Sequence, residues 1–567
     1  MKLDRYKLLL FPIGFAVVAL GLLAGLLHAT GADLAGSNKT LVVAADATAG
    51  MQPQLNALAD AWPGSLVGQD GVARQYHLLA YRDAVQYLGS TDNEDEFRSL
   101  LRELNAAGGG DCPDAVFQAL RAAARGAPDS RALLFGGSAP QGDSSTLAYI
   151  VNKLVERRVS AYPAISGWCT EASLTQEALS TLALLTGGLP FPHEAEEAET
   201  AAERAFNAMA LADTLMIGGE MVDGESILPL TLDSTATTLG VNQAKCCRCL
   251  TCTLAVRQSP SLVDLPSDTN MTIRDPDGDI LTAGDPGVEL LDTSMGRSIL
   301  IDIAQVYTPD PGEASATWEI IVDGEGEVLL RADADTGVHL TYPGSHVMRA
   351  GNQRPLRAIL RSDAAAPAID QTSVQFLMIN ATNGQEFELA LFDDGQHGDG
   401  QAGDGLYGGR VNARPGIWYL AARGKLADGG AFERLYEVPL RVKSFEGRKP
   451  GDNQQVAGNS TMLRFQVTNE VETARSQATQ QMYELSLESL QGWATAADLP
   501  RIISLAPGET ATFDVQLTVP ENTPADTQEE TSLTVMEFGN IAGSETLSVV
   551  TTVVDEMNVF LPAAIRP

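Results

Sequence analysis

The sequence predicts a multidomain protein in which one doubly wound α/β domain precedes about three all-β sandwiches. Three observations lead to this prediction. The chain has 567 residues, which is too many for a single hydrophobic core. Up to residue 217, apolar strand patterns alternate with helical stripes, which indicates a mostly parallel sheet covered by helices. After residue 217 the helical stripes stop, and short alternating runs lie between turns rich in Gly, Pro, Asp and Asn.

The charge balance excludes nucleic acid as an expected partner. The chain has 38 Lys and Arg against 73 Asp and Glu, so its net charge is -35. Phosphate binding needs a basic face, which this composition does not favour. An apolar fraction of 44% with 20% charged residues is typical of globular domains. This composition fits an exported protein or one that binds divalent cations.

The first 35 residues have the order of an export signal. Basic residues precede the apolar run Leu8–Leu27, and small residues follow it up to Ala35. This order is typical of a signal peptide, and the run is also about long enough to cross a bilayer as an uncleaved anchor. In both cases the charges would keep the amino terminus inside. We therefore expect an extracellular or cell-surface protein that meets a membrane only through this segment.

The stretch Leu41–Met51, LVVAADATAGM, opens the α/β domain. It indicates a buried strand that ends on Asp46, followed by Thr48 and by a helix over residues 52–62. Ligands of doubly wound sheets bind outside the carboxyl ends of the strands. A carboxylate and a hydroxyl two residues apart on one turn can face the same hard cation. The same two side chains can instead cap the start of the helix, and the residues alone leave both interpretations open.

The other elements of this domain follow from their periodicity. Strands are expected at Gln75–Tyr81, Ala132–Phe135 and Ser160–Ile165. Helices are expected around Phe97–Leu104, Ala115–Leu120, Leu147–Val155, Leu174–Leu185 and Glu194–Met209. A glycine-rich loop, GGGDCPD at residues 108–114, leads into the second of these helices, and Gly187 is a C-cap signal for the fourth.

These residues resemble the von Willebrand factor type A domain over about Asn38–Ile217. The resemblance rests on the strand end Asp46–Met51, the GGGDCPD loop and the later LALLTGG, and it is nearest to the subgroup seen in hemicentins and related extracellular proteins. The family implies an α/β adhesion or ligand-binding domain with a metal-ion-dependent site for Mg²⁺ or Ca²⁺. In that family a carboxylate of the ligand completes the coordination of the metal.

Carried over to this sequence, the metal ligands that the resemblance implies are Asp46, Thr48 and Asp111. The sequence departs from the family pattern at Gly50, where a serine hydroxyl is usual, and at Gly137, where the third loop has an aspartate. We therefore expect a partly degenerate metal site. The alternative is a domain that keeps the fold and binds partners without metal.

The six cysteines of an exported chain suggest disulfides. The resemblance implies a pair between Cys112 and Cys169, because the resembling subgroup has cysteines at both places. The other four lie in the cluster CCRCLTC at residues 246–252, whose C-x-x-C spacing is also that of half a zinc site or a redox pair. Disulfides, free thiols and a metal site all stay open for this cluster.

The turns divide the rest of the chain into three sandwiches. We expect domains at residues 218–342, 343–443 and 444–567, after a leader at 1–35 and the α/β domain at 36–217. In the first sandwich, ATWEIIVDGEGEVLLRADA predicts a hairpin with its turn at Asp323-Gly324. The second and third resemble immunoglobulin-like modules of bacterial surface proteins, the third through its GW and LAPGET…TVP segments.

The second sandwich contains an acidic, glycine-rich loop, FDDGQHGDGQAGDGLYGG at Phe392–Gly409. Carboxylates separated by glycines, here Asp394, Asp399 and Asp404, can fold around Ca²⁺, which accepts flexible oxygen cages. The spacing is not that of an EF-hand, since no Glu closes a twelve-residue frame. The other interpretation is a turn between two strands.

No catalytic motif supports an enzyme. HEAEE at His193–Glu197 lacks the second histidine of a zinc protease, and the chain has neither a G-x-S-x-G elbow nor a Walker loop. The resemblance therefore implies a surface-associated adhesion or ligand-binding protein with a protein, matrix or envelope ligand. The alternative is a structural stalk whose type A domain has lost its metal.

Overall fold

The computed structural model describes residues 40–62, 75–108, 115–137, 144–166, 176–211, 213–246, 269–310, 312–381, 384–470 and 480–555. All of them belong to one compact unit, residues 39–567. The expected leader, Asp111, Cys112, Cys169 and the cysteines after residue 246 lie outside the described residues. Within the described ranges, no helix has the length and apolarity to cross a membrane.

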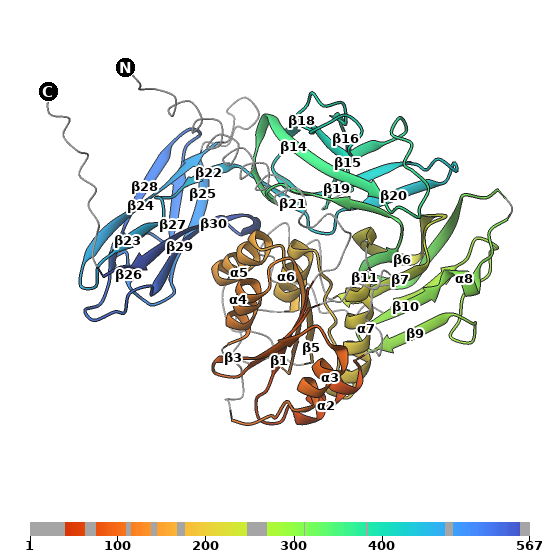
Figure 1. The fold of residues 1–567 in the computed structure, drawn as a ribbon, viewed down its shortest axis with the longest axis horizontal. Coiled ribbons are helices and arrows are strands. Elements are labelled where there is room, and N and C mark those ends of the chain that lie inside the picture. The colour runs from red at the N-terminus through yellow and green to blue at the C-terminus, as the bar shows by residue number, and fades with distance from the viewer. Residues whose placement is uncertain are drawn as a thin grey trace, which may run out of the picture. The chain divides into compact units, whose positions relative to one another are not determined.

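The first domain is a five-stranded sheet with helices, which confirms the predicted α/β class (Figure 1). The strand order is β3-β2-β1-β4-β5, and every neighbouring pair is parallel except β2 and β3. The strands are β1 (Thr40–Asp46), β2 (Tyr76–Tyr81), β3 (Val85–Thr91), β4 (Ser130–Gly136) and β5 (Ser160–Ile165). The helices are α2 (Gln52–Asp60), α3 (Glu94–Arg102), α4 (Val116–Gly126), α5 (Ser144–Glu156), α6 (Gln176–Thr186) and α7 (Ala198–Ala210), with a short 3₁₀ turn η1 (Ala195–Glu197).

Two details of this domain differ from the prediction. Strand β3 is an antiparallel edge strand that the sequence pattern did not reveal, because it alternates poorly and leaves Tyr87 exposed. The expected helix over Glu194–Met209 is divided into η1 and α7. A reciprocal capping box between Glu194 and Glu197 satisfies the backbone groups at the start of η1.

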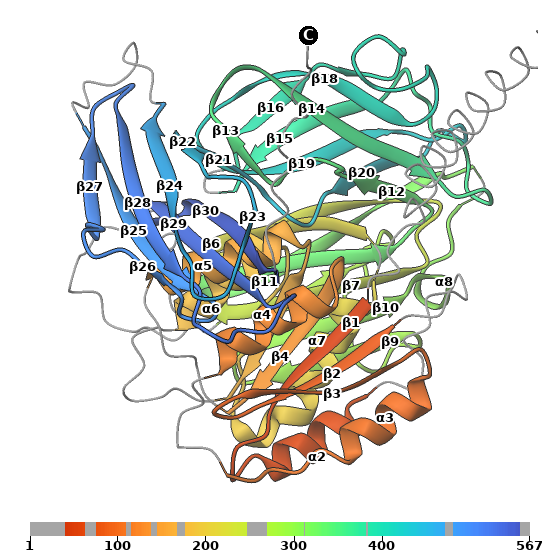
Figure 2. The ribbon, with the colours of Figure 1, turned by 60° about the vertical axis from the view of Figure 1, so that its left-hand side comes forward.

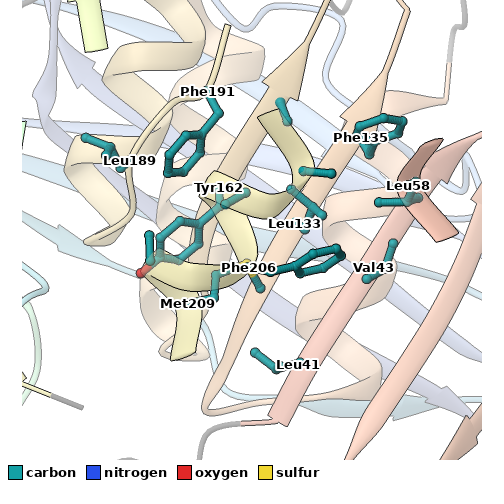
Figure 3. Close-up of a cluster of buried hydrophobic side chains, with 14 of the residues drawn as sticks. Leu41, Val43, Leu58, Leu133, Phe135, Tyr162, Leu189, Phe191, Phe206 and Met209 are labelled. Carbon is teal, nitrogen blue, oxygen red and sulfur yellow. The ribbon is translucent and has the colours of Figure 1, made fainter. Parts of the chain in front are cut away.

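The central strand β1 is buried on both faces. Val43 packs with Leu58 of α2 and Phe206 of α7 on one face, which Figure 3 shows. Val42 packs with Leu120 of α4 on the other face. Because successive side chains of a strand point to opposite faces, an unbroken apolar strand is what two covered faces require. After the apolar run Leu41–Ala45, the strand ends on Asp46, at the carboxyl edge of the sheet.

The next domain is built on two 21-residue strands, β6 (Asp213–Asp233) and β11 (Ser315–Asp335), which pair antiparallel along their length. The predicted hairpin at Asp323-Gly324 is therefore wrong, since β11 continues through that point. Gly324 lies opposite Gly224, and both have positive φ angles, of 126° and 97°. Such angles favour glycine. The Asp323-Gly324 pair therefore marks a local irregularity within the long two-stranded ribbon, and not a turn that ends a strand.

The two halves of β11 have different neighbours. Its first half pairs with β8 (Asn270–Arg274) and its second with β7 (Thr238–Cys246). Trp318 and Ile320 of the first half share one hydrophobic cluster with Val328 and Leu330 of the second. The ribbon thus contributes apolar side chains to one core from both halves. The remaining elements are β9 (Val288–Thr293), β10 (Gly296–Asp302) and the short helix α8 (Ile303–Val306).

The following domain has two sheets around a core that includes Trp418 and Phe376. One sheet has the order β12-β14-β18-β17, and the other strands continue the sheet of β6 and β11 through the pair β20–β6 (Figure 2). The strands are β12 (Val338–Thr341), β13 (Val347–Arg349), β14 (Gly351–Ser362), β15 (Gln375–Asn380), β16 (Glu386–Leu389), β17 (Leu391–Phe392), β18 (Leu406–Ala413), β19 (Gly416–Lys425), β20 (Ala431–Leu435) and β21 (Leu440–Lys443).

The C-terminal domain is another pair of sheets, with the orders β22-β24-β28-β26 and β23-β30-β29-β25-β27. Its strands are β22 (Phe445–Arg448), β23 (Asn453–Gln455), β24 (Ser460–Asn469), β25 (Gln481–Ser489), β26 (Ala494–Thr495), β27 (Ile502–Leu505), β28 (Thr510–Thr518), β29 (Gln528–Glu537) and β30 (Asn540–Val553). The all-β part of the predicted fold class is thus confirmed, while the domain limits that we drew from the sequence stay predictions.

An ion-pair cluster joins the C-terminal domain to the α/β domain. The carboxylate of Glu530, on β29, lies 2.6 Å from the guanidinium of Arg125, 3.5 Å from that of Arg121 and 2.5 Å from the ammonium of Lys153. Burial alone would raise the pKa of Glu530, but the hydrogen bond and charge of Lys153, with the two arginines, lower it to about 2. This carboxylate is therefore charged throughout the physiological pH range.

We expect Glu530→Gln to destabilise the protein at neutral pH but much less in acid. Because the folded pKa is depressed, the stabilisation is complete above the unfolded value and is lost as pH falls toward about 2. A shift of this size, discounted for partial exposure, corresponds to about 1–2 kcal/mol. Thermal melts between pH 7 and pH 2 would measure it, with Glu521→Gln as the control. An equal deficit of Glu530→Gln at both pH values would contradict the assignment.

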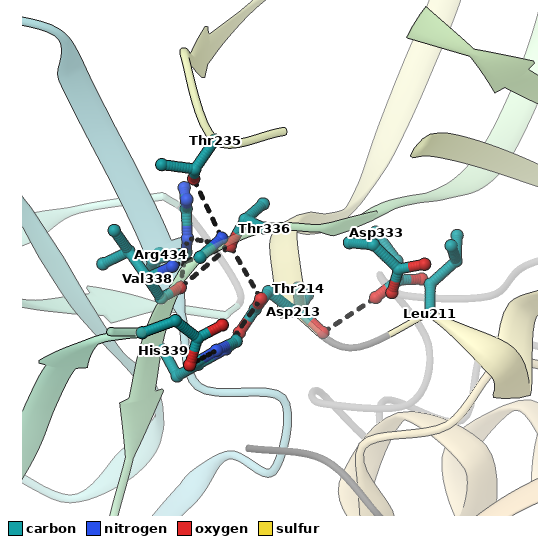
Figure 4. A network of polar contacts seen from close by, with 12 residues as sticks. Leu211, Asp213, Thr214, Thr235, Asp333, Thr336, Val338, His339 and Arg434 are labelled. Carbon is teal, nitrogen blue, oxygen red and sulfur yellow. Dashed lines mark hydrogen bonds and ion pairs between the residues drawn. The ribbon is translucent and has the colours of Figure 1, made fainter. Parts of the chain in front are cut away.

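A buried polar network links the two middle domains (Figure 4). The imidazole Nδ1 of His339 lies 3.0 Å from both carboxylate oxygens of Asp213, and Thr336 donates its hydroxyl to the same carboxylate. Arg434 donates to the hydroxyl of Thr336 and pairs with Asp233. Burial would lower the pKa of His339, yet hydrogen bonds and charges from Asp213 and Asp363 raise it to about 9.

We expect the folded protein to lose stability in mild alkali through His339. A histidine whose folded pKa is raised stabilises fully below its unfolded value of about 6.5, and this contribution disappears as pH rises through about 9. His339→Gln keeps a donor for Asp213 but cannot titrate. Its melting temperature should stay nearly constant between pH 6 and pH 9.5, while that of the unaltered protein falls by several degrees. Parallel curves for the two proteins would rule out His339 as the titrating group.

Candidate functional site

The candidate site lies at the carboxyl edge of the α/β sheet, where β1 ends. Asp46 is 1% exposed there. Its Oδ1 accepts the backbone N–H of Thr48 at 2.9 Å, and its Oδ2 accepts that of Gly137 at 3.3 Å. The loop after β1 and the loop after β4 are therefore held together by a single carboxylate. Asp46 and Thr48 lie where the sequence placed them, at a position where doubly wound sheets bind ligands.

Backbone contacts bring a third loop to this edge. The N–H of Ala49 donates to the carbonyl of Gly108 at 2.8 Å, and the N–H of Ala107 donates to the carbonyl of Ala47 at 3.1 Å. The beginning of the GGGDCPD loop is thus paired with the turn that carries Thr48. Asp111 itself lies outside the described residues, so its place relative to Asp46 stays a prediction.

Two side chains that hold the loops of this edge were not predicted from the sequence. Arg82, which follows β2, donates its Nε–H to the carbonyl of Ala47 at 2.6 Å and its Nη2–H to that of Asn105 at 2.7 Å. Tyr81 donates its hydroxyl to the carbonyl of Phe135 at 3.2 Å. Burial, and then the charge of Asp46, hold the pKa of Tyr81 well above its usual range. A guanidinium therefore cross-links the loops of the candidate site, and a neutral phenol lies beneath them.

The donor set fits a divalent cation only in part. Mg²⁺ prefers about six oxygen ligands, several of which are waters. Among the residues that the structure describes at this edge, only Asp46 and Thr48 supply side-chain oxygens of the implied set. A Cβ added at Gly137 would lie 2.5 Å from the sulfur of Met51, which is itself 5% exposed. A thioether thus fills the space beside the position where the family pattern has an aspartate.

The buried histidine at the neighbouring strand end was also missed. His193 stacks on Phe135 with 5.9 Å between ring centroids, and its Nδ1 lies 3.1 Å from the carbonyl of Phe191. Burial lowers the pKa of His193, which favours the neutral ring. Its Nε2 is buried without a hydrogen-bond partner among the described residues. The one pattern that pointed to this residue was the HEAEE segment, which does not fit a zinc motif. No cluster of three His, Cys, Asp or Glu that could hold a metal occurs in the described ranges.

The acidic loop of the third domain lies between β17 and β18, and its carboxylates accept backbone N–H groups. Asp399 is fully buried and accepts the N–H groups of Asp394, Gly395 and His397 at 2.5, 2.6 and 2.8 Å. Burial opposes the ionisation of Asp399, but these backbone donors lower its pKa overall.

The other carboxylates of this loop have the same kind of partner. Asp393 accepts the N–H groups of Gly403 and Gly405, and Asp404 accepts those of Gln401 and Leu406. Asp394 accepts the N–H of Gln396, and its pKa is lowered chiefly by a hydrogen bond from His397. These contacts hold a turn between two strands. Calcium binding by Asp394, Asp399 and Asp404 stays a prediction, as does the disulfide between Cys112 and Cys169.

We expect Asp399→Asn to lower the melting temperature by at least ~3 °C, because an amide offers one acceptor atom where the carboxylate offers two to buried N–H groups. Asp404→Asn, at an exposed position of the same loop, is the matched control and should change it less. Melts with and without 1 mM Ca²⁺ would test the ion at the same time. A rise of the melting temperature with Ca²⁺ that is lost in both variants would support a calcium site. Equal melting of all three proteins would contradict a structural role of Asp399.

Comparisons with known proteins agree with this architecture. Residues 40–192 match the family model of the von Willebrand factor A domain, and residues 339–442 match that of the conditioned medium factor 2nd Ig-like domain. No curated protein matches the chain in sequence.

Solved structures give only distant likenesses. A von Willebrand factor type A protein from Catenulispora acidiphila is 13% identical at a TM-score of 0.25, over 58% of this chain and 63% of that one. The native form of the E. coli alpha-2-macroglobulin is 12% identical at 0.19, over 60% and 23%. The human COPII-coat protein Sec24c is 10% identical at 0.25, over 72% and 44%. This chain thus spans less than two thirds of each, and similarity this low says nothing of function.

The strand order and the polar carboxyl edge of the first sheet agree with the two family models on which domains the chain contains. Its membership of the hemicentin-like subgroup and the partial loss of the metal site stay predictions. Residues 40–192 are a von Willebrand factor A domain, and residues 339–442 are an Ig-like domain.

Proposed function

We propose that the chain is an exported, surface-associated adhesion or ligand-binding protein that engages its partner at the carboxyl edge of the von Willebrand factor A sheet. The presence of the domain at residues 40–192 supports a ligand-binding role. The observation that carries the proposal is the position of Asp46, a buried acid at the end of the central strand that joins the loops after β1 and β4. The leader-like segment at residues 1–35 supports export.

In this proposal Asp46, Thr48 and Asp111 hold Mg²⁺ or Ca²⁺. The cation would supply an electrophilic position for a carboxylate of a protein, matrix or envelope ligand. Asp46 orients the turn that carries Thr48, and Arg82 fixes the same turn through the carbonyl of Ala47. The β-sandwich domains hold the A domain away from the surface to which the chain is attached. We propose no catalytic role for any residue.

A second function is favoured by the thioether of Met51, which lies against the loop after β4. Met51 fills the space beside Gly137, and Gly50 has no hydroxyl. A domain with these changes can serve as a structural stalk that has lost metal binding and keeps Asp46 for its loop contacts. The two functions differ in one measurable respect, which is whether ligand binding needs the charge of Asp46.

The test compares Asp46→Asn with Asp399→Asn in the full chain. Calorimetric titration with Mg²⁺ and with Ca²⁺ measures cation binding, and beads coated with the protein measure attachment to collagen, fibronectin and fibrinogen surfaces. Asp46→Asn keeps the size of the side chain and one acceptor atom but removes its charge. We expect it to weaken Mg²⁺ binding and bead attachment at least ~10-fold, which corresponds to the loss of one charged ligand.

Asp399→Asn is the control for an ion in the Ig-like domain. If only Asp399→Asn lost the heat of cation binding, the cation would lie in the acidic loop, and the result would favour the structural stalk as the function. Attachment that is unchanged in Asp46→Asn and insensitive to chelation would refute the proposed site. Melting temperatures measured for each variant separate loss of binding from loss of the fold.

A further inference from the structure

The Ig-like domain contains a cavity of about 260 Å³ that belongs to neither site described above. Its apolar lining includes Met378, Phe387 and Trp418, which come from β15, β16 and β19. Trp418 is 4% exposed, and its indole N–H donates to the carbonyl of Arg414 at 2.9 Å. Its ring lies 5.2 Å from that of Phe387. The aromatic lining is therefore fixed by packing and by a hydrogen bond.

Two exposed arginines line the same cavity. The guanidinium of Arg414 lies 4.3 Å from the ring centroid of Phe387, and Arg410 donates its Nη1–H to the carbonyl of Gln353 at 3.0 Å. Both side chains are thus held in position by contacts that leave their charge unneutralised. A guanidinium presents a rigid fork of donors that matches a carboxylate in shape.

These arginines have no carboxylate partner among the described residues, although the chain has an excess of acidic side chains. Arg423 of the same domain shows the usual arrangement, since it pairs with Glu386 at 2.7 Å and with Glu433 at 2.8 Å. Glu388 is the one acidic residue that lines the cavity. It alternates with Phe387 and Leu389 along β16, so its side chain lies on the opposite face of that strand.

We propose that this cavity binds a free small molecule that has an aromatic or branched apolar body and one carboxylate. The body packs against Met378, Phe387 and Trp418, and the carboxylate accepts hydrogen bonds from Arg410 and Arg414. An apolar cavity of about 150 Å³ holds a benzene molecule, whereas drug-sized ligands use cavities of about 300 Å³ or more. The volume here therefore suits one ring with a short acidic chain. This inference is independent of the A-domain site.

The experiment uses three probes of one size and different charge, which are 3-phenylpropionate, 3-phenylpropionamide and 3-phenylpropylamine. Calorimetry on the full chain measures their affinities. The variants are Arg410→Gln and Arg414→Gln. Arg357→Gln is the matched control, because Arg357 is an exposed arginine of the neighbouring strand β14 that does not line the cavity.

We expect the carboxylate to bind at least ~10-fold more tightly than the amide, with the amine weakest. Arg410→Gln and Arg414→Gln should each weaken carboxylate binding about 5- to 10-fold, leave amide binding unchanged and melt at the same temperature as the unaltered protein. Arg357→Gln should change the affinity less than about twofold. Equal binding of acid and amide, an equal loss in all three variants, or no binding of any probe would each overturn the proposal.

Discussion

The buried carboxylate of Glu437 is the contact on which the assembly of the first three domains depends. It lies 3.1 Å from the guanidinium of Arg131 on β4 of the A domain and 3.4 Å from that of Arg331 on β11. Arg331 also pairs with Asp333 at 2.7 Å, so two cations meet two anions in a region closed to water. Removing one partner from such a group typically costs about 3–5 kcal/mol, because a buried charge is left uncompensated. The domains therefore do not behave as independent modules on free linkers.

The interdomain contacts of the A domain involve several of its parts. Arg131 lies at the start of β4 and pairs with Glu437, so the amino edge of the sheet is held against the β domains. Helices α4 and α5 face the C-terminal domain through the Glu530 cluster. On α7, Arg204 is fully buried and donates to Ser298 and Thr293 of the following domain. Among the residues that the structure describes, those around Asp46 take part in none of these interdomain contacts.

The sequence predicted those parts of the molecule that local pattern controls. The buried strand that ends at Asp46 and the helices of the A domain follow from apolar periodicity, because each needs only its own neighbours in the chain. The hairpin at Asp323-Gly324 failed for the opposite reason, since the partner of β11 is a strand about a hundred residues earlier. The contact between the sulfur of Met51 and Gly137 could not be predicted either, because it depends on how two loops meet in the fold. The spacing of the acidic residues indicated that their carboxylates share one loop, but it did not reveal the backbone N–H groups that these carboxylates accept.

The geometry of Asp46 gives this acid a structural role that does not depend on a metal. In the family pattern this carboxylate contributes to a cation, yet here its two oxygens also accept the N–H groups of Thr48 and Gly137. A buried N–H that loses its acceptor costs about 1–3 kcal/mol, so replacing Asp46 would be unfavourable even in a chain that binds no metal. Residues whose only role would be to bind the cation are not under this constraint. Replacing an aspartate with glycine and a nearby thioether removes a hard, charged donor without breaking a loop contact, and hard cations bind thioethers poorly. The presence of Asp46 alone therefore does not distinguish adhesion from a stalk, whereas the effect of its charge on binding does.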